Sequence, residues 1–316
     1  MIEHRGLRAL EAVAEHETVT AAAAVLRFTP SAVSQQIAHL ADEVGAPLLE
    51  RQGRNVHLTP AARLLLQRTQ HLNAAWEATK AEVSSSSTKP TGHIRFCGVS
   101  SAIAALIAPV ISRLKLTQSQ IRASVIEEET SDCYKLLTLG EADIAVVLPT
   151  QDSPAHSDPR FEQHTLVVDE QDVLVPKGHA LASRESIDLT ELASESWIAK
   201  RRDNDTYSLL SAACAAAGFT PQVVHEAKEW YAISALVSAG LGLCLLPRLV
   251  PIPAEHHVVR VPLRGAIRPT RRFLTSTRRG RCHHPLIKLG LEALAELAET
   301  GPLTPQPHGR SSVSSG

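Results

Sequence analysis

The stretch that decides the fold spans residues 7–62 and runs LRALEAVAEHETVTAAAAVLRFTPSAVSQQIAHLADEVGAPLLERQGRNVHLTPAA. Apolar residues recur in it at helical spacing in two groups, which are Leu7, Leu10, Val13 and Ala14, then Ala22, Val25 and Leu26. Thr18 stands just before the second group, where its side chain can cap a helix. We therefore expect two short helices in direct succession.

A third helix is predicted to begin after Thr29. Its side-chain oxygen can cap the helix, and Pro30 suits the first helical position because its missing N–H has no role there. The apolar side of this helix consists of Val33, Ile37 and Leu40. The opposite side carries small groups that can lie against base edges and phosphates in a major groove, and these are Ser31, Ser34, Gln35 and Ala38.

The run LLERQGRNVHLT at residues 48–59 predicts a hairpin with strands at 48–51 and 56–59. Gly53 permits the tight turn, and the hairpin presents Arg51 and Arg54. Three helices followed by this hairpin predict a winged helix-turn-helix that binds double-stranded DNA. Two alternatives stay open: the helices form a protein-interaction module with a solvated polar face, and Arg51 is a structural ion-pair partner.

Charge gives little support to strong DNA binding by one subunit. The 316 residues carry a net charge of −1, and residues 1–60 hold five arginines against seven acidic residues, a net of −2. Nonspecific affinity for DNA comes largely from neutralising phosphates, so one copy alone should bind weakly. The candidate DNA-binding residues are Thr29, Pro30, Ser31, Ser34, Gln35, Arg51 and Arg54.

Residues 5–62 closely resemble the N-terminal domain of LysR-type transcriptional regulators, in the branch whose recognition helix begins T-P-S-A-V-S. Later segments agree in order, because GEADIAV at 140–146 and LVSAGLGLCLLP at 236–247 resemble motifs of the family's effector-binding domain. Two positions depart from many relatives, which have Arg in place of Gln35 and Gly in place of Ala62. The resemblance implies dimers that often pair into tetramers.

Residues 60–83 are predicted to form one long linker helix, because Thr59 and Pro60 repeat the cap-and-proline start. Leu65, Leu72, Trp76 and Val83 then fall near a and d positions of a heptad. We expect this stripe to pair two subunits, which places two recognition helices on the half-sites of a near-palindrome. The alternative is that the stripe packs against the chain's own domain.

The Ser-rich stretch at 84–91 predicts a linker, after which strands alternate with helices in βαβ units around mostly parallel sheets. The expected architecture is α/β, with a winged helix-turn-helix at 1–60, the linker helix at 60–83 and an effector-binding domain at 92–300. That domain is expected to have two lobes, lobe I at about 92–164 and 266–300 and lobe II at about 165–265. The resemblance implies a fold like that of periplasmic binding proteins. Residues 301–316 are expected to be a disordered tail.

An unidentified small-molecule effector is expected between the lobes, as the resemblance implies. The strand after His93 ends at two serines that open a helix, which suits a polar or anionic ligand. The candidate effector-binding residues are Ser100, Ser101 and Thr150 from lobe I and Lys200, Arg201 and Trp230 from lobe II. Plain helix capping by the serines, exposed charge at Lys200 and Arg201, and a core position for Trp230 are the alternatives.

Catalysis, cofactors and metals are not expected. GVSSA at 98–102 resembles the nucleophile elbow G-x-S-x-G, but its fifth residue is Ala and no partner His or Asp is evident. The paired histidines at 256–257 and 283–284 are placed in loops rather than at a metal. Five widely spaced cysteines are typical of reduced, buried thiols.

The chain is expected to act in the cytoplasm, without membrane association, because its first residues lack an apolar leader and no apolar run reaches about 20 residues. A transporter's solute-binding protein is the rival reading of the two lobes, but that role requires a leader and leaves the helix-turn-helix unexplained. RNA polymerase is the expected partner in the output, directly or indirectly.

Overall fold

The computed structural model describes residues 5–52, 55–85, 91–118, 120–202 and 204–300. These residues belong to two compact units. The helical unit comprises Met1–Thr88 with the short segments Ser157–Glu162 and Arg278–Pro285. The sheet unit comprises Lys89–His156, Gln163–Thr277 and Leu286–Gly316. The predicted tail at 301–316 lies outside the described residues.

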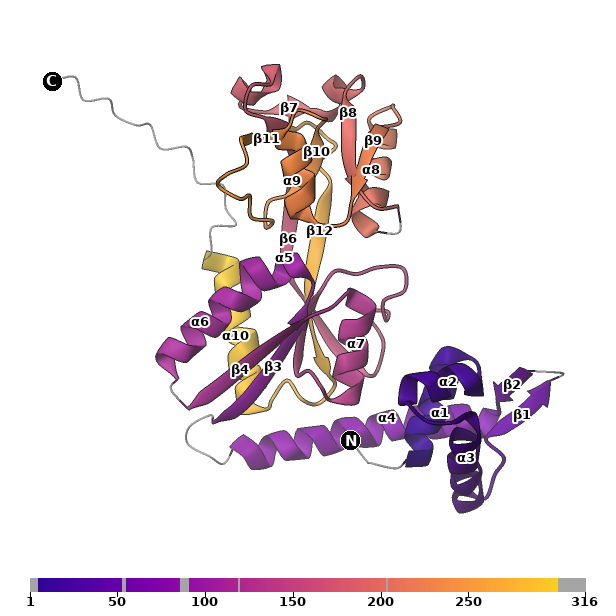
Figure 1. The fold of residues 1–316 in the computed structure, drawn as a ribbon. Helices are drawn as coiled ribbons and strands as arrows, with labels where there is room; N and C mark the ends of the chain where they lie inside the picture. Colours follow the sequence, from indigo (N-terminus) through magenta and orange to yellow (C-terminus); the bar gives the residue numbers. More distant parts are fainter. Residues whose placement is uncertain (1–4, 53–54, 86–90, 119, 203, 301–316) are drawn as a thin grey trace. The chain divides into compact units, whose positions relative to one another are not determined.

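The helical unit contains the three predicted helices, α1 (Arg5–His16), α2 (Val19–Leu26) and α3 (Pro30–Val44). A hairpin of β1 (Leu49–Gln52) and β2 (Asn55–Leu58) follows, and then the long helix α4 (Pro60–Ser85) (Figure 1). Its core is made by residues of α1, α2, α3 and the start of α4. The winged helix-turn-helix fold predicted from the sequence is thereby confirmed.

The starts of the second and third helices agree with the prediction. Thr18 accepts a hydrogen bond from the Ala21 N–H (3.1 Å), as a cap should. Ala14 is exposed and Val25 is 46% exposed, so neither belongs to the core. In α1 the buried side is instead completed by Ala9 and Ala12.

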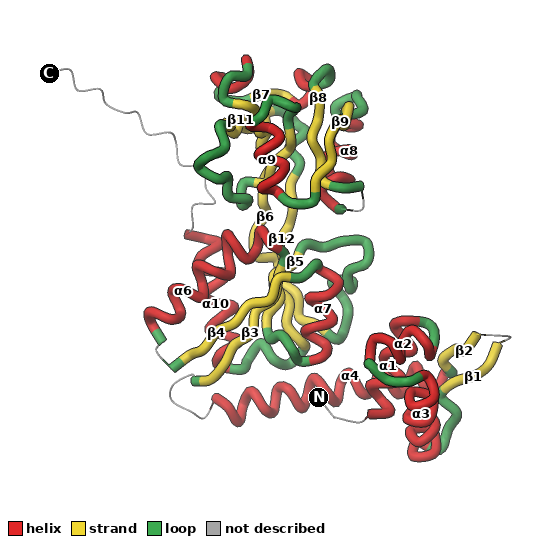
Figure 2. The backbone as a smooth tube through the Cα atoms, viewed as in Figure 1, coloured by secondary structure: helices red, strands yellow, loops and turns green. Residues whose placement is uncertain are grey.

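Lobe I of the sheet unit is a sheet with helices on both faces (Figure 2). Strand β3 (Gly92–Gly98) pairs in parallel with β4 (Ile121–Glu127) and β5 (Ile144–Val147), as expected for βαβ units. Helix α7 (Thr130–Leu139) connects β4 to β5, and α10 (Pro285–Thr300) packs with α6 (Ala108–Thr117) on the core. The sheet is not parallel throughout, because β12 (Thr270–Arg278) pairs antiparallel with β5.

Lobe II has a separate core. Strand β8 (Ser196–Lys200) pairs in parallel with β9 (Gln222–Ala227), and helices α8 (Asp205–Ala216) and α9 (Trp230–Ser238) pack on it. β10 (Cys244–Pro247) and β11 (Val258–Arg264) both pair antiparallel with β6 (Phe161–Pro176), and β11 also pairs with the short β7 (Ile187–Asp188). Trp197 is fully buried at the centre of this lobe.

Two strands pass between the lobes. β6 runs from lobe I into lobe II, and β12 returns, as Figure 1 shows for the two long strands that join the halves of this unit. The chain therefore crosses between the lobes twice, and a cleft lies between them.

The first helical stretch of the sheet unit spans Ser100–Thr117. Judged only by its length and composition, it could cross a membrane. Its side chains Leu106, Ile107, Val110 and Leu114 are buried in the core of lobe I. The middle of the helix, Ile103–Ile107, has π-helical hydrogen bonding. Packing therefore accounts for its apolar character.

Candidate functional site

The exposed side of α3 is polar, as predicted. Thr29 Oγ1 accepts a hydrogen bond from the Ala32 N–H (3.2 Å) and lies 3.0 Å from the Ser31 hydroxyl. Val33, Ile37 and Leu40 are buried below it. The candidate contacts on this helix are all exposed, and they are Thr29, Pro30, Ser31, Ser34 and Gln35.

The turn between α2 and α3 depends on a left-handed residue. Arg27 has φ +56° at the end of α2, and its N–H bonds the Ala24 carbonyl (3.3 Å). The next N–H, from Phe28, bonds the Ala23 carbonyl (2.9 Å). These bonds satisfy carbonyls at the helix end and redirect the chain into the Thr29 cap.

The wing is a two-stranded hairpin in which Leu49 pairs with Leu58 and Arg51 with Val56. Its strands are shifted by about one residue from the prediction, which placed Leu48 and Thr59 inside them. Arg51 is on β1, and Gly53 and Arg54 lie outside the described residues. Thr59 donates a hydrogen bond to the Pro47 carbonyl (2.7 Å), which fixes the base of the hairpin at the start of α4.

Helix α4 has an exposed apolar stripe. Leu72, Trp76 and Val83 are 58%, 50% and 70% exposed, and Leu65 is half-buried. Lys80 Nζ lies 6.0 Å from the centre of the Trp76 ring. Within the described residues, the three outer members of the stripe have no apolar core around them.

The other side of α4 buries a carboxylate. Glu77 is 4% exposed and accepts a hydrogen bond from Lys80 (2.7 Å), while Arg278 and Arg281 lie at 3.7 and 3.4 Å. Burial raises the pKa of Glu77, but these cations outweigh it and hold the pKa at about 2. Gly280 (φ +85°) lies so close that a Cβ there would collide with the Ala74 carbonyl.

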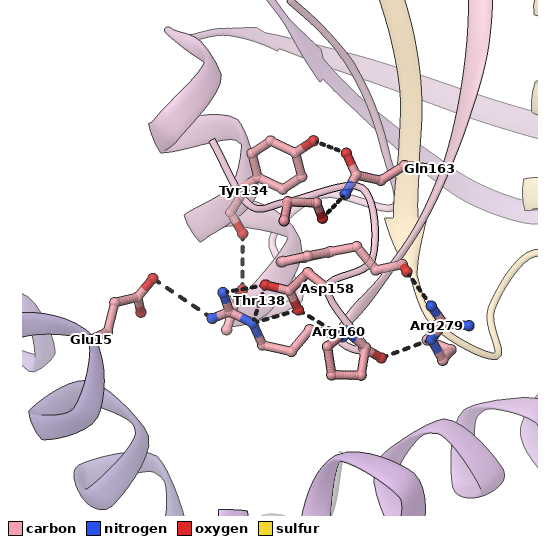
Figure 3. A network of polar contacts seen from close by, with 10 residues as sticks. Glu15, Tyr134, Thr138, Asp158, Arg160, Gln163 and Arg279 are labelled. Atoms are coloured by element: carbon pink, nitrogen blue, oxygen red, sulfur yellow. Dashed lines mark hydrogen bonds and ion pairs between the residues drawn. The ribbon is translucent and has the colours of Figure 1, made fainter. Parts of the chain in front are cut away.

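A second polar contact of the helical unit joins α1 to the segment Ser157–Glu162. Arg160 Nη2 bonds Asp158 (2.9 Å), and Arg160 Nη1 lies 3.7 Å from Glu15 of α1 (Figure 3). Arg279 supports the same segment by donating to the Pro159 carbonyl (2.8 Å). Burial raises the pKa of the neighbouring Glu11.

The cleft between the lobes of the sheet unit has a volume of about 1060 Å³. It brings together every one of the six effector-binding candidates, Ser100, Ser101, Thr150, Lys200, Arg201 and Trp230, which come from four separate segments of the chain. The Lys200 ammonium lies 4.8 Å from the centre of the Trp230 ring and donates to the Lys228 carbonyl (2.5 Å). The Thr150 hydroxyl lies 2.9 Å from that of Ser153.

The floor of the cleft contains a buried arginine that sequence reasoning did not identify as a site residue. Arg271 begins the returning strand β12 and is 6% exposed. Its Nη2 donates to Asp169 on β6 (2.8 Å) and to the Ser101 hydroxyl (3.4 Å). Its Nε is buried and has no hydrogen-bond partner.

The sequence analysis also did not identify the acidic residues on the lobe I wall of the cleft. Glu127 ends β4, Glu128 and Glu129 follow it directly, and all three line the cleft with exposed side chains. A signal existed in the sequence, because acidic residues after a parallel strand lie at the edge where ligands bind. No residue that lines the cleft in the described part of the chain is a histidine.

Neither metals nor reactive thiols mark a site in the described residues. No group of three or more His, Cys, Asp or Glu side chains that could hold a metal is found among them. The five cysteines are free, and Cys97, Cys133, Cys214 and Cys244 are buried. In the arginine-rich segment at 260–281, Arg264 pairs with Glu191 (2.8 Å).

Two family models match this chain. The model described as "Bacterial regulatory helix-turn-helix protein, lysR family" matches residues 4–63, and "LysR substrate binding domain" matches residues 87–299. Together they account for both the helix-turn-helix and the two-lobed part.

Individual relatives are distant but cover most of the chain. The regulator ShiR of Corynebacterium glutamicum is 29% identical over 274 residues, 83% of this chain and 88% of its own. AlsR of Bacillus subtilis is 30% identical over 257 residues, 78% of this chain and 80% of its own. A full-length OxyR variant from Pseudomonas aeruginosa superposes with a TM-score of 0.61 at 20% identity, covering 93% of this chain and 95% of that one.

Proposed function

Since the chain belongs to the LysR family of bacterial transcription regulators, which bind DNA and a small-molecule effector and are not enzymes, we propose specific residues for each of these activities. The DNA contacts are made by the exposed polar side of α3 and by the wing. The observation that carries this proposal is the capped start of α3, where Ser31, Ser34 and Gln35 are exposed over a fully buried apolar side. Such groups reach base edges and phosphates without steric obstruction.

The proposed contacts are Thr29, Pro30, Ser31, Ser34 and Gln35 from α3, with Arg51 and Arg54 from the wing. The N-terminus of α3 adds backbone N–H groups that favour a phosphate. Because two arginines supply all the formal positive charge in this set, one subunit makes few phosphate contacts, and two subunits are needed for useful affinity.

The proposed active form is a homodimer paired through α4, and a pair of dimers is its higher assembly. Leu72, Trp76 and Val83 form an exposed apolar stripe on this helix, and Leu65 continues it. Exposed aromatic and aliphatic side chains at heptad spacing gain by burial against an identical helix.

The effector is proposed to bind in the cleft of the sheet unit, in contact with Ser100, Ser101, Thr150, Lys200, Arg201 and Trp230. An effector that binds one arrangement of the lobes more tightly than another shifts the population toward it. In the proposed mechanism this change alters the spacing or bend of bound promoter DNA and so the access of RNA polymerase. The protein is proposed to act in the cytoplasm, where promoter DNA and polymerase are found.

The proposed domain boundaries are 1–60 for DNA binding, 60–83 for dimerisation and 92–300 for the effector. Lobe I takes about 92–164 and 266–300, and lobe II takes about 165–265. The separate cores of the two lobes support this division.

The test is a mobility shift with footprinting, at fixed salt, on the DNA that flanks the protein's own gene. We expect the wild type to protect a near-palindrome. The double variant Ser34→Ala and Arg54→Ala should lose this protection. If no DNA is protected even at low salt, with or without a small-molecule extract of the cells, the proposal is wrong and the α3 surface must be tested for protein binding.

A further inference from the structure

The two walls of the interlobe cleft carry opposite charge. The lobe I wall, made by the lining residues at 99–101, 127–131 and 148–152, contributes four carboxylates, those of Glu127, Glu128, Glu129 and Asp152, and no Lys or Arg. Among the residues that the structure describes, lobe II contributes four cations, those of Lys200, Arg201, Arg202 and Lys228, with one carboxylate, that of Glu229. A ligand between these walls therefore meets a negative surface on one side and a positive surface on the other.

The lobe I carboxylates are not neutralised by the protein itself. Within the described residues, no hydrogen bond or ion pair involves the side chains of Glu127, Glu128 or Glu129. On lobe II, in contrast, Arg202 pairs with Glu226 (3.1 Å). Unpaired carboxylates side by side repel an anion and attract a cation.

The floor of the cleft, where Arg271 lies, attracts an anion, whereas the lobe I wall attracts a cation. Arg271 is more than nine-tenths buried, and only its Nη2 is used, by Asp169 and Ser101. Its Nε has no hydrogen-bond partner, so this guanidinium is not saturated by the protein. Arg271 lines the cleft, so an oxyanion on a ligand can bond its guanidinium, and arginine binds carboxylates with two parallel hydrogen bonds.

We propose that the effector is a zwitterion, with a carboxylate or other oxyanion held by Arg271 and Ser101 at the floor and a protonated amine facing Glu127, Glu128 and Glu129. The inference rests on the proposed effector role of this cleft. A ligand that is only anionic meets the repulsion of the lobe I wall, and one that is only cationic meets Arg271 and the wall of lobe II. A ligand with both charges is attracted by both surfaces.

The test separates a small-molecule extract of the producing cells into three pools by ion exchange. Compounds with both an amine and an acid are retained by a cation exchanger at low pH and by an anion exchanger at high pH. The other pools are acids without amines and amines without acids. Each pool is added to the full-length protein, and the unfolding temperature is measured.

Only the pool with both groups should raise the unfolding temperature, by several degrees, as expected when a ligand of the folded state exceeds its Kd about a hundredfold. A shift from the acid pool or the amine pool alone, or no shift from any pool, would overturn the inference.

Two triple variants with the same change in net charge test whether the lobe I carboxylates bind the amine. The triple variant Glu127→Gln, Glu128→Gln and Glu129→Gln should lose at least tenfold in affinity for the active compound and gain affinity for its amine-free analogue. The control triple, Glu185→Gln, Glu292→Gln and Glu299→Gln, makes the same change in net charge on exposed residues outside the cleft and should bind as the wild type does. Equal losses in both triples would overturn the inference.

A DNA footprint measured without ligand distinguishes a failure of the zwitterion proposal from a failure of the proposed function. If DNA is protected but the active pool is purely acidic, the zwitterion is wrong and the regulator stands. If DNA is not protected, the proposed function fails, whatever the pools show.

Discussion

Arg271 and Asp169 form a buried ion pair that joins the two strands crossing between the lobes, with 2.8 Å between Nη2 and Oδ2 and side-chain exposures of 5% and 0%. Asp169 also accepts the Leu249 N–H through Oδ1 (3.1 Å). A buried ion pair gains little over an apolar pair, but removal of one partner leaves an uncompensated charge.

The variant Asp169→Asn should therefore lose about 3–5 kcal/mol of unfolding free energy, measured by urea denaturation. Asp152→Asn, at an exposed carboxylate of the same cleft, is the matched control and should unfold as the wild type does. Equal stability of Asp169→Asn and the wild type would show that the pair does not stabilise the crossing strands.

Ser34→Ala and Gln35→Ala should each weaken specific DNA binding by about 1–3 kcal/mol, since each removes a hydrogen-bonding group from the groove-facing side of α3. Both residues are exposed, so the unfolding temperature should not change. The dependence of affinity on salt should also be unchanged, because neither side chain carries charge. Thr117→Ala, which removes an exposed hydroxyl from the sheet unit, is the control; equal affinity of all three variants contradicts the assignment of α3.

Trp76→Glu should convert the dimer to monomer, because it places a carboxylate in the middle of the exposed stripe of α4. Size-exclusion chromatography with light scattering measures the mass directly. His71→Glu introduces the same charge at an exposed position on another side of the helix and should leave the dimer intact. A dimeric Trp76→Glu would mean that α4 pairs through other residues or not at all.

Features that depend only on neighbouring residues could be predicted from the sequence, whereas contacts between residues far apart in the chain could not. Thr29 and Pro30 define the start of α3 by themselves, since a cap needs only its own neighbours. Thr59 was predicted correctly as the cap of α4, since its hydroxyl accepts a hydrogen bond from the Ala62 N–H (3.1 Å). It was also placed inside a strand, and its hydrogen bond to the Pro47 carbonyl, twelve positions away, was not predicted. Residue type alone does not reveal such a bond.

The candidate site shows the same contrast. Ser100 and Ser101 could be proposed because they follow a strand and open a helix. The importance of Arg271 depends on Asp169, which is 102 residues away, and on burial between strands from both ends of the effector-binding part. The sequence pattern contained an arginine in an arginine-rich segment, and nothing in it distinguished this one from its neighbours.

The buried thiols should react slowly. Burial raises the pKa of Cys214 and of Cys244 to about 12, so at pH 8 roughly one thiol in ten thousand is ionised at these positions. We expect iodoacetamide to label them in urea but not in the native protein over the same minutes, as measured by mass spectrometry of peptides. Rapid native labelling of either residue would show that its part of lobe II opens readily.

The low pKa of Glu77 makes the helical unit sensitive to acid. The carboxyl has a pKa of about 2 in the folded protein against 4.5 as its ordinary value, so its ionised form stabilises the fold. This stabilisation is present above pH 4.5 and is lost as the pH falls from there toward 2. At pH 7, Glu77→Gln should lose about 1–3 kcal/mol, because Lys80, Arg278 and Arg281 lose their shared acceptor. The difference between variant and wild type should narrow from pH 5 to pH 2.5 in urea denaturation, while Glu299→Gln should follow the wild type at every pH. A constant difference across that range would mean that Glu77 acts through packing rather than through its charge.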